Sequence, residues 1–244
     1  MTRRPIITSL ALTGALLTVP SVARPLWARQ GAPGPDQHVA ALKQSLQESQ
    51  QRLRQYEWIE TTVISLKGEE KSRKQQRCYY GADGRLQKVP IGDAPQQDQG
   101  GGRRGGRLKQ KIVEKKKGEM QDYMERAGNL VHLYVPPSPG QIQSARDAGK
   151  VAIRPLAQER ARLEFSDYLQ AGDRLGIEVD TTANRLLGLT VATYLEKPED
   201  AVTLDVRMGT LSDGTGFTEE TTFDAAAKQI RVVIQNSGYR PLGR

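Results

Sequence analysis

The sequence contains few of the residues from which most catalytic and metal sites are built. It has one cysteine in 244 residues, which excludes a disulfide scaffold and a cysteine-rich zinc or iron–sulfur site, since each needs several thiolates. Two histidines, His38 and His132, leave little for a metal cage or a catalytic triad, and no Gly-x-Ser-x-Gly or HExxH motif is present. The glycines of residues 100–106 do not connect a strand to a helix of a βαβ unit, as a phosphate-binding loop does. We therefore predict no enzyme activity, no cofactor and no metal.

Long hydrophobic runs are also scarce, and the clearest one lies at the start of the chain. The uncharged stretch Ile6–Val19 follows Arg3 and Arg4 and precedes the small residues Ser21 and Ala23, a pattern typical of a bacterial secretory signal peptide. The stretch is shorter than the roughly 20 residues that cross a bilayer. We expect export to the periplasm or secretion, with no transmembrane segment in the mature chain. The general and the twin-arginine export routes both remain open.

The positive charge is concentrated in the first half of the mature chain. Residues 24–150 hold 23 basic and 14 acidic side chains, whereas residues 151–244 hold 11 and 14. Most of the excess lies in Arg103–Arg126, which is either a solvated helix face or a surface for anionic lipid headgroups or an acidic envelope protein. Export argues against a nucleic-acid partner. The candidate contacts with an anionic surface are Arg103, Arg104, Arg107, Lys109, Lys111, Lys115, Lys116 and Lys117.

The spacing of apolar residues changes along the chain from helical to alternating. It predicts a helix that begins at Asp36, a long helix over 107–135 that ends before Pro136-Pro137, and a short helix over 139–148. Alternation and β-branched residues predict strands over 56–66, up to Tyr80, over 85–91, and then five or six strands in the last ninety residues, among them 174–180, 187–195, 202–208 and 230–234.

These elements predict an α+β fold. The turns between the late strands are too short for a crossover helix, so the strands form an antiparallel meander. We expect a curved antiparallel sheet, or half-barrel, packed around the N-terminal helix and the central helical insertion. The predicted organisation is a signal peptide (1–23), a flexible tether (24–35) and one α+β domain (36–244) with a Gly/Gln-rich loop (92–107) and a helical insertion (107–149).

Several short segments carry a resemblance over nearly the whole mature chain: Cys78–Gly84 (CYYGADG), Tyr134–Pro137 (YVPP), Asp167–Leu169 (DYL), Thr193–Asp200 (TYLEKPED), Ser212–Thr215 (SDGT) and Asn236–Tyr239 (NSGY). They resemble a family of secreted bacterial proteins that has no assigned activity, so no site residue follows from them. The order of elements also resembles the periplasmic lipoprotein-carrier (LolA-like) half-barrel. That resemblance implies a hydrophobic cavity for acyl chains.

The candidate ligand-binding residues lie on the long predicted helix. Met120, Tyr123, Met124 and Tyr134 could line a soft acyl pocket or pack in the core. Paired carboxylates such as Glu57 and Glu60 are expected to point to opposite faces of a strand as solvated charges.

The sequence leaves two functional hypotheses. The first is a non-enzymatic periplasmic or envelope module that binds a hydrophobic or amphipathic ligand, such as a lipid or a lipoprotein acyl chain, in a half-barrel. The alternative is an envelope interaction or scaffold module with a filled core and no ligand. A dry interior without bound lipid would favour the alternative.

The leader makes a direct prediction about the mature N-terminus. Because the small residues Ser21 and Ala23 form a cleavage site, intact-mass measurement of envelope fractions should find a chain that begins near Arg24, or near Arg29 if cleavage follows Ala28. Recovery of the full-length chain from the cytoplasm alone would contradict export.

Overall fold

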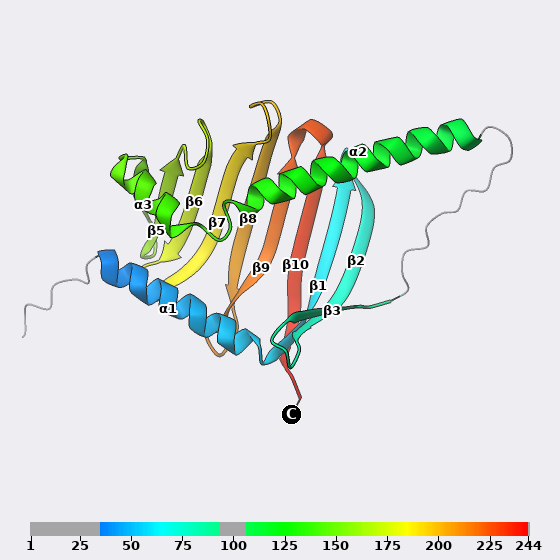
Figure 1. Ribbon diagram of the computed structural model, residues 1–244. Helices are drawn as coiled ribbons and strands as arrows, with labels where there is room; N and C mark the ends of the chain where they lie inside the picture. The colour runs from blue at the N-terminus through cyan, green and yellow to red at the C-terminus, as the bar shows by residue number, and fades with distance from the viewer. Residues whose placement is uncertain (1–34, 93–105, 244) are drawn as a thin grey trace, which may run out of the picture. The chain divides into compact units, whose positions relative to one another are not determined.

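The computed structural model describes residues 35–92 and 106–243, which belong to one compact unit, Pro35–Arg244 (Figure 1). The predicted signal peptide, nearly all of the predicted tether and most of the Gly/Gln-rich loop lie outside the described residues.

Three helices occupy the predicted positions. α1 (Pro35–Leu53) and α2 (Gly106–His132) each begin one residue inside a segment predicted as irregular, and α3 (Pro139–Asp147) ends one residue early. α2 ends at His132 rather than Val135, because the chain tightens into a turn in which the Tyr134 N–H donates to the Val131 carbonyl at 2.9 Å. Within the described residues, no helix is long and apolar enough to cross a membrane.

All the strands of the described residues form one antiparallel sheet that is curved and not closed into a barrel, as predicted (Figure 1). The order across the sheet is β3-β2-β1-β10-β9-β8-β7-β6-β5-β4, so β1 pairs with the last strand of the chain. The strands are β1 (Tyr56–Leu66), β2 (Glu69–Tyr80), β3 (Leu86–Pro90), β4 (Val151–Leu156), β5 (Arg160–Ser166), β6 (Arg174–Asp180), β7 (Arg185–Tyr194), β8 (Ala201–Thr210), β9 (Gly216–Ala225) and β10 (Ile230–Pro241).

The number of late strands differs from the prediction of five or six, because seven strands, β4–β10, follow α3. Alternation predicted β6, β7, β8 and β10, and it predicted none of β4, β5 and β9. β4 is a short edge strand that contains Arg154 and Pro155, and a proline weakens a strand pattern wherever it occurs. β5 alternates Ala161, Leu163 and Phe165 with charged residues, and the prediction missed this short signal.

The register of the strands aligns apolar side chains into rows across the sheet. One row on the helix-bearing face, called the core row, connects neighbouring strands through successive cross-strand pairs: Phe165, Leu175, Val191, Leu204, Phe223, Val232 and Ile64. The first five of these side chains are buried. We call this the inner face and the opposite one the outer face.

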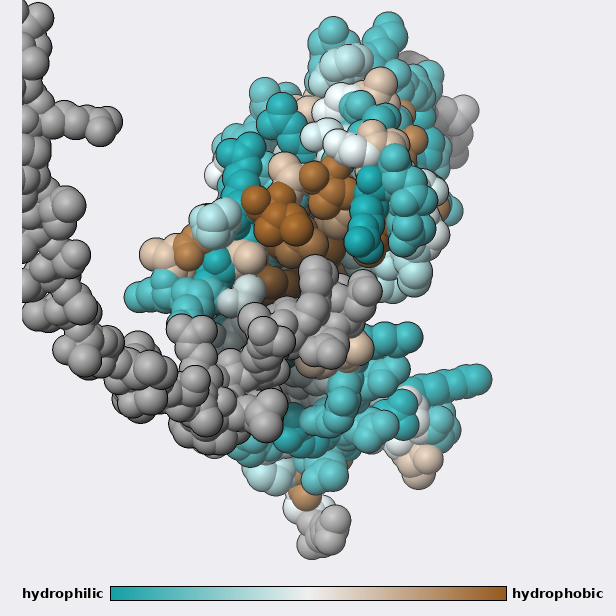
Figure 2. Space-filling model, turned by 90° about the vertical axis from the view of Figure 1, so that its left-hand side faces the viewer, coloured by the Kyte–Doolittle hydropathy of each residue, from teal (hydrophilic) through white to brown (hydrophobic). Residues whose placement is uncertain are grey.

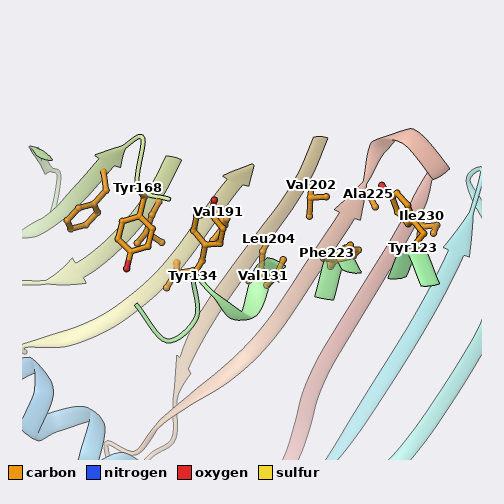
Figure 3. Packing of buried hydrophobic residues seen from close by; sticks show 14 of the residues in the cluster. Tyr123, Val131, Tyr134, Tyr168, Val191, Val202, Leu204, Phe223, Ala225 and Ile230 are labelled. Atoms are coloured by element: carbon orange, nitrogen blue, oxygen red, sulfur yellow. The ribbon is translucent and has the colours of Figure 1, made fainter. Parts of the chain in front are cut away.

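The C-terminal half of α2 covers the core row. Tyr123, Ala127 and Val131 of α2 and Tyr134 after it belong to the same buried cluster as the core row (Figure 3). The predicted apolar stripe of this helix therefore packs on the sheet, as expected from its spacing. Burial of such side chains contributes about 1.5–3 kcal/mol each before conformational entropy is subtracted.

A hydrogen-bonded group of buried polar residues fixes the chain that leaves α2. The Tyr134 hydroxyl donates to Oδ2 of Asp173 at 2.5 Å and lies 2.8 Å from Oγ1 of Thr193. Asp173 is fully buried, and its carboxylate also accepts the backbone N–H groups of Tyr168, at 2.5 Å, and of Leu169 and Gln170, each at 2.9 Å. Burial, and then the bond to Asp173, raise the pKa of Tyr134, so its hydroxyl remains a donor.

Replacement of Asp173 tests this group. Asp173→Ala leaves several buried donors without an acceptor, and each such donor costs about 1–3 kcal/mol, so we expect the free energy of unfolding to fall by about 3–5 kcal/mol. The matched control is Asp167→Ala in the same loop, whose exposed carboxylate accepts only the Gly172 backbone N–H and lies 3.4 Å from Lys150 Nζ. Denaturant unfolding should show a clearly smaller loss for the control. Equal losses in the two variants would mean that the buried hydrogen bonds of Asp173 contribute no more to stability than the exposed contacts of Asp167.

Candidate functional site

A second row of side chains on the inner face lies next to the core row and is only partly covered. It is displaced by two residues along each strand, and successive cross-strand pairs connect its members. We call it the inner strip: Ile153, Leu163, Ile177, Leu189, Val206, Thr221, Ile234 and Thr62.

Exposure distinguishes the inner strip from the core row. Leu189 is buried, Ile153 at the edge strand is 68% exposed, and the other members are half-buried. Apolar side chains left half-buried in a row provide a surface that a hydrophobic group can cover. Viewed from the side on which α3 and β5 lie in Figure 1, hydrophobic side chains gather in a hollow with hydrophilic ones around it (Figure 2).

The inner strip adjoins a cavity between α1 and the sheet. The cavity measures about 240 Å³, and its apolar lining comes from both layers: Leu46 and Leu53 of α1, and Tyr80, Leu186, Met208 and Phe217 of the sheet. Met208 and Leu186 are each a few residues along their strands from Val206 and Leu189 of the strip. The strip and the cavity therefore form one largely apolar surface.

A hydrogen bond attaches the side of α1 to the sheet near this cavity. Ser49 is buried, and its Oγ accepts the backbone N–H of Gly216 at 3.1 Å. A Cβ on Gly216 would lie 3.3 Å from that Oγ, so the helix and strand are in close contact. After α1, Tyr56 donates to Oδ2 of Asp213 at 2.8 Å, which holds the same turn of the sheet.

One guanidinium lines the cavity. Arg185 Nη1 donates to Thr210 Oγ1 at 3.2 Å and Nη2 lies 3.8 Å from Asp180 Oδ2, whereas its Nε is buried without a hydrogen-bond partner among the described residues. Arg185 is the only charged lining residue in the described part of this cavity. The site can therefore offer apolar contact, hydroxyl and amide groups and one guanidinium, and its described lining contains no nucleophile paired with a general base.

The structure separates the four candidate ligand residues predicted on α2. Tyr134 lies beyond the helix end, in the hydrogen-bonded group with Asp173, and Tyr123 is buried and donates to Asp200 at 2.6 Å. Burial is the main cause that raises the pKa of Tyr123. Met124 packs against the core, while Met120 lines a cavity of about 660 Å³ near the β1–β2 turn, together with Leu66, Lys67 and Lys228. The sequence could not distinguish these places, because all four positions share one apolar stripe.

Most of the predicted anionic-surface residues have no described side chain. Arg103 and Arg104 lie outside the described residues, and α2 carries Arg107, Lys109, Lys111, Lys116 and Lys117 with side chains that are likewise not described. Lys115 is exposed, and its Nζ lies 3.9 Å from Glu119. A surface pair of this kind contributes little to stability.

The expectation that Glu57 and Glu60 are solvated is wrong. Glu60 is 8% exposed on the inner face, where Lys88 Nζ lies 2.7 Å from each of its carboxylate oxygens. Glu57 is mostly covered and pairs with Arg240. The reason is the tertiary pairing: β1 is an interior strand between β2 and β10, and β3 brings Lys88 alongside, none of which local alternation predicts.

An aromatic cluster beside Glu60 was not expected from the sequence. The Trp58 ring stacks on Tyr239 with centroids 5.5 Å apart, and Phe217 lies 4.4 Å from Tyr239. Trp58 Nε1 donates to Oδ1 of Asn236 at 3.1 Å. Because its members come from β1, β9 and β10, only the strand pairing could have revealed the cluster.

Comparison with known proteins gave similarities at the level of solved structures. A scan of family models and a search of curated proteins gave no match. A LolA superfamily protein from Nitrosomonas europaea matches with a TM-score of 0.35 and 9% identity, over 83% of this chain and 94% of that one. A DUF1329 family protein from Desulfovibrio piger matches with a TM-score of 0.34 and 10% identity, over 83% and 92%. The first belongs to the superfamily that the order of elements had indicated, and similarities this distant assign no site.

The buried thiol of Cys78 next to Glu60 yields a prediction. Cys78 has no exposed surface, and burial, assisted by the Glu60 charge, raises its pKa. We expect alkylation of the folded protein near pH 8 to be at least about tenfold slower than after unfolding, because the thiolate is the reacting form. We expect Cys78→Ser to lower the free energy of unfolding by about 1–2 kcal/mol.

The raised pKa of Cys78 fixes the sign of the pH dependence of stability. The thiol leaves the free energy of unfolding unchanged below the ordinary thiol pKa of about 8.5. It lowers that free energy as the pH rises through the raised pKa, because ionisation is penalised only in the folded state. Rapid labelling of the folded chain would contradict a packed, unreactive thiol.

Proposed function

We propose that this protein is a non-enzymatic module of the bacterial envelope that binds the hydrophobic part of an amphipathic ligand on its inner face. The observation that carries the proposal is the inner strip, a row of half-buried apolar side chains that continues into the cavity under α1. The chemical class of ligand is an acyl chain, whether of a free lipid or of a lipoprotein.

The energetics favour a flexible apolar ligand. Each methylene transferred from water to an apolar surface contributes about 0.8 kcal/mol, so even partial burial of a long chain gives useful affinity. The Leu, Ile, Val and Met side chains in the strip and cavity form no hydrogen bonds, so their contacts do not depend on direction. Such contacts suit a ligand without polar groups along its length. This lining supports binding as the proposed role.

The proposed place of action is the periplasm or the cell exterior. It rests on the predicted leader and suits a module that handles acyl chains between membranes. The basic residues around α2 would then steer the protein toward anionic headgroups, with about 1 kcal/mol for each lysine near the surface. The rival function, a scaffold with no ligand, remains the outcome to be distinguished by experiment.

Substitution on the two faces of β8 tests the proposal. Val206 belongs to the inner strip, and Thr203 on the same strand is exposed on the outer face. Val206→Gln places an amide where the acyl chain would lie, and an unpaired buried amide costs about 1–3 kcal/mol, so affinity for a pyrene-labelled fatty acid should fall about tenfold. Thr203→Gln introduces the same side chain on the other face and should bind like the wild type.

Two measurements accompany the titration. Thermal unfolding of both variants shows whether each remains folded, and native mass spectrometry of protein from envelope fractions detects co-purified lipid. Failure of the wild-type protein to bind the probe or to carry lipid would favour the scaffold function. Equal weakening by both substitutions would place the ligand elsewhere.

A further inference from the structure

The outer face of the same sheet carries a polar groove that the proposed acyl site does not use. It measures about 730 Å³, within the range of about 300–1,000 Å³ that small-molecule sites occupy. Its floor is formed by small residues, Gly176 of β6 with Thr190 and Ala192 of β7. Arg162 and Arg174 line it on β5 and β6, and the carboxylates of its lining are Glu164, Asp205 and Asp224, of which Asp224 lies 3.7 Å from Arg231.

Gly176 has no side chain and therefore leaves space in the floor of the groove beside the arginines. A Cβ at this position would lie 2.4 Å from Thr190 Oγ1 and 3.6 Å from Arg162 Nε. The Arg162 side chain therefore lies close to the glycine, and Arg174 is two residues away on the same face of β6. In the register of the two strands, Arg162 pairs with Glu178 and Arg174 pairs with Ser166, so the two arginines lie on either side of Gly176 along the groove.

These two arginines lack ion-pair partners among the described residues, although carboxylates are close along the strands. Glu164 pairs with Arg154 at 2.8 Å, Glu178 pairs with Arg160 at 3.3 Å, and Asp167 lies 3.4 Å from Lys150. Each nearby carboxylate is thus engaged by another cation. Arg162 is half-buried and Arg174 is exposed, and a guanidinium without a counterion can receive an incoming anion in paired hydrogen bonds.

The remaining lining is suited to hydroxyl groups. The side-chain hydroxyls of Thr190, Thr203 and Thr222 line the groove, and none bonds to another group in the described part of the chain. Asp205 lies across the groove, two strands from Gly176 and so about 10 Å away. Guanidinium groups without a counterion, together with hydroxyl groups that make no other bond, match an acidic, polyhydroxylated molecule.

We propose that the outer groove binds an anionic carbohydrate, with a sugar carboxylate or phosphate held by Arg162 and Arg174 and the ring hydroxyls held by the threonines and Asp205. Guanidinium groups form paired hydrogen bonds with the oxygens of either anion, which is the shared chemistry of the two sources. The acyl site and this groove lie on opposite faces of one sheet. Binding at one therefore does not require displacement from the other.

The test uses three probes: tetragalacturonate, which carries carboxylates, glucose 6-phosphate, which carries a phosphate, and maltotetraose, which is neutral. Calorimetry should show that the wild-type protein binds at least one anionic probe and that high salt weakens the binding. Arg162→Gln and Arg174→Gln should each weaken it by at least about tenfold. Ala192→Phe, which fills the floor without a change in charge, should abolish it.

The matched control is Arg77→Gln on the outer face of β2, outside the groove. Arg77 is exposed and lies 3.9 Å from Glu57, so its loss should leave both the fold and the binding unchanged. Preference for one anionic probe identifies the carboxylate or the phosphate as the source. Absence of binding by both, equal binding of maltotetraose, or equal weakening by the Arg77 variant would overturn the proposal. Binding of the pyrene-labelled fatty acid should persist in the groove variants, so the two proposals fail independently.

Discussion

The pairing of β1 with β10 is the interaction on which the rest of the structure depends. It joins the three strands before α2 to the seven after it, and so produces one sheet instead of two. The register places Leu66 opposite Ile230 and Ile64 opposite Val232, which continues the apolar rows across the junction. A slip of one residue would turn every side chain of β1 to the other face, so that Trp58 would leave the inner face and Glu57 would leave its partner Arg240. The apolar pattern therefore fixes the register.

One alternation of side chains along these strands gives the sheet two chemically different faces. On β8, Val202, Leu204 and Val206 face the helices, while Thr203 and Asp205 face the outer groove. The inner face is thus suited to apolar ligands and the outer one to polar ligands, without any separate domain for either. Successive residues of a strand point to opposite faces, so a substitution on one face leaves the side chains of the other face unchanged. Paired variants on a single strand can therefore test the two faces separately.

The sequence predicted the elements whose signal is local. The helices, β1 and the meander follow from spacing and turn residues, and the class of fold follows from their order. It could not predict that β1 joins β10, because that contact links residues separated by almost the whole domain. The same lack of information on long-range strand pairing explains the error at Glu60, whose burial depends on β2, β10 and Lys88 of β3. For the site, Val206 and Ile234 were recognisable as apolar strand residues, but only the register aligns them in a strip.

α1 and α2 cover the inner face to different extents, and this difference explains where apolar surface remains uncovered. Among the described side chains of α1 only Ser49 is buried, whereas α2 buries Tyr123, Ala127 and Val131 and is fixed beyond its end by Tyr134 and Asp173. The cavity that Met120 of α2 lines lies near the β1–β2 turn, and its described lining contains no residue of the inner strip, whereas the closely packed part of α2 begins at Tyr123. A ligand beneath that part of α2 would have to displace buried side chains at several kcal/mol, while one beneath α1 covers groups that are already half in water. Binding on the inner strip is therefore more favourable beneath α1 than beneath the closely packed part of α2.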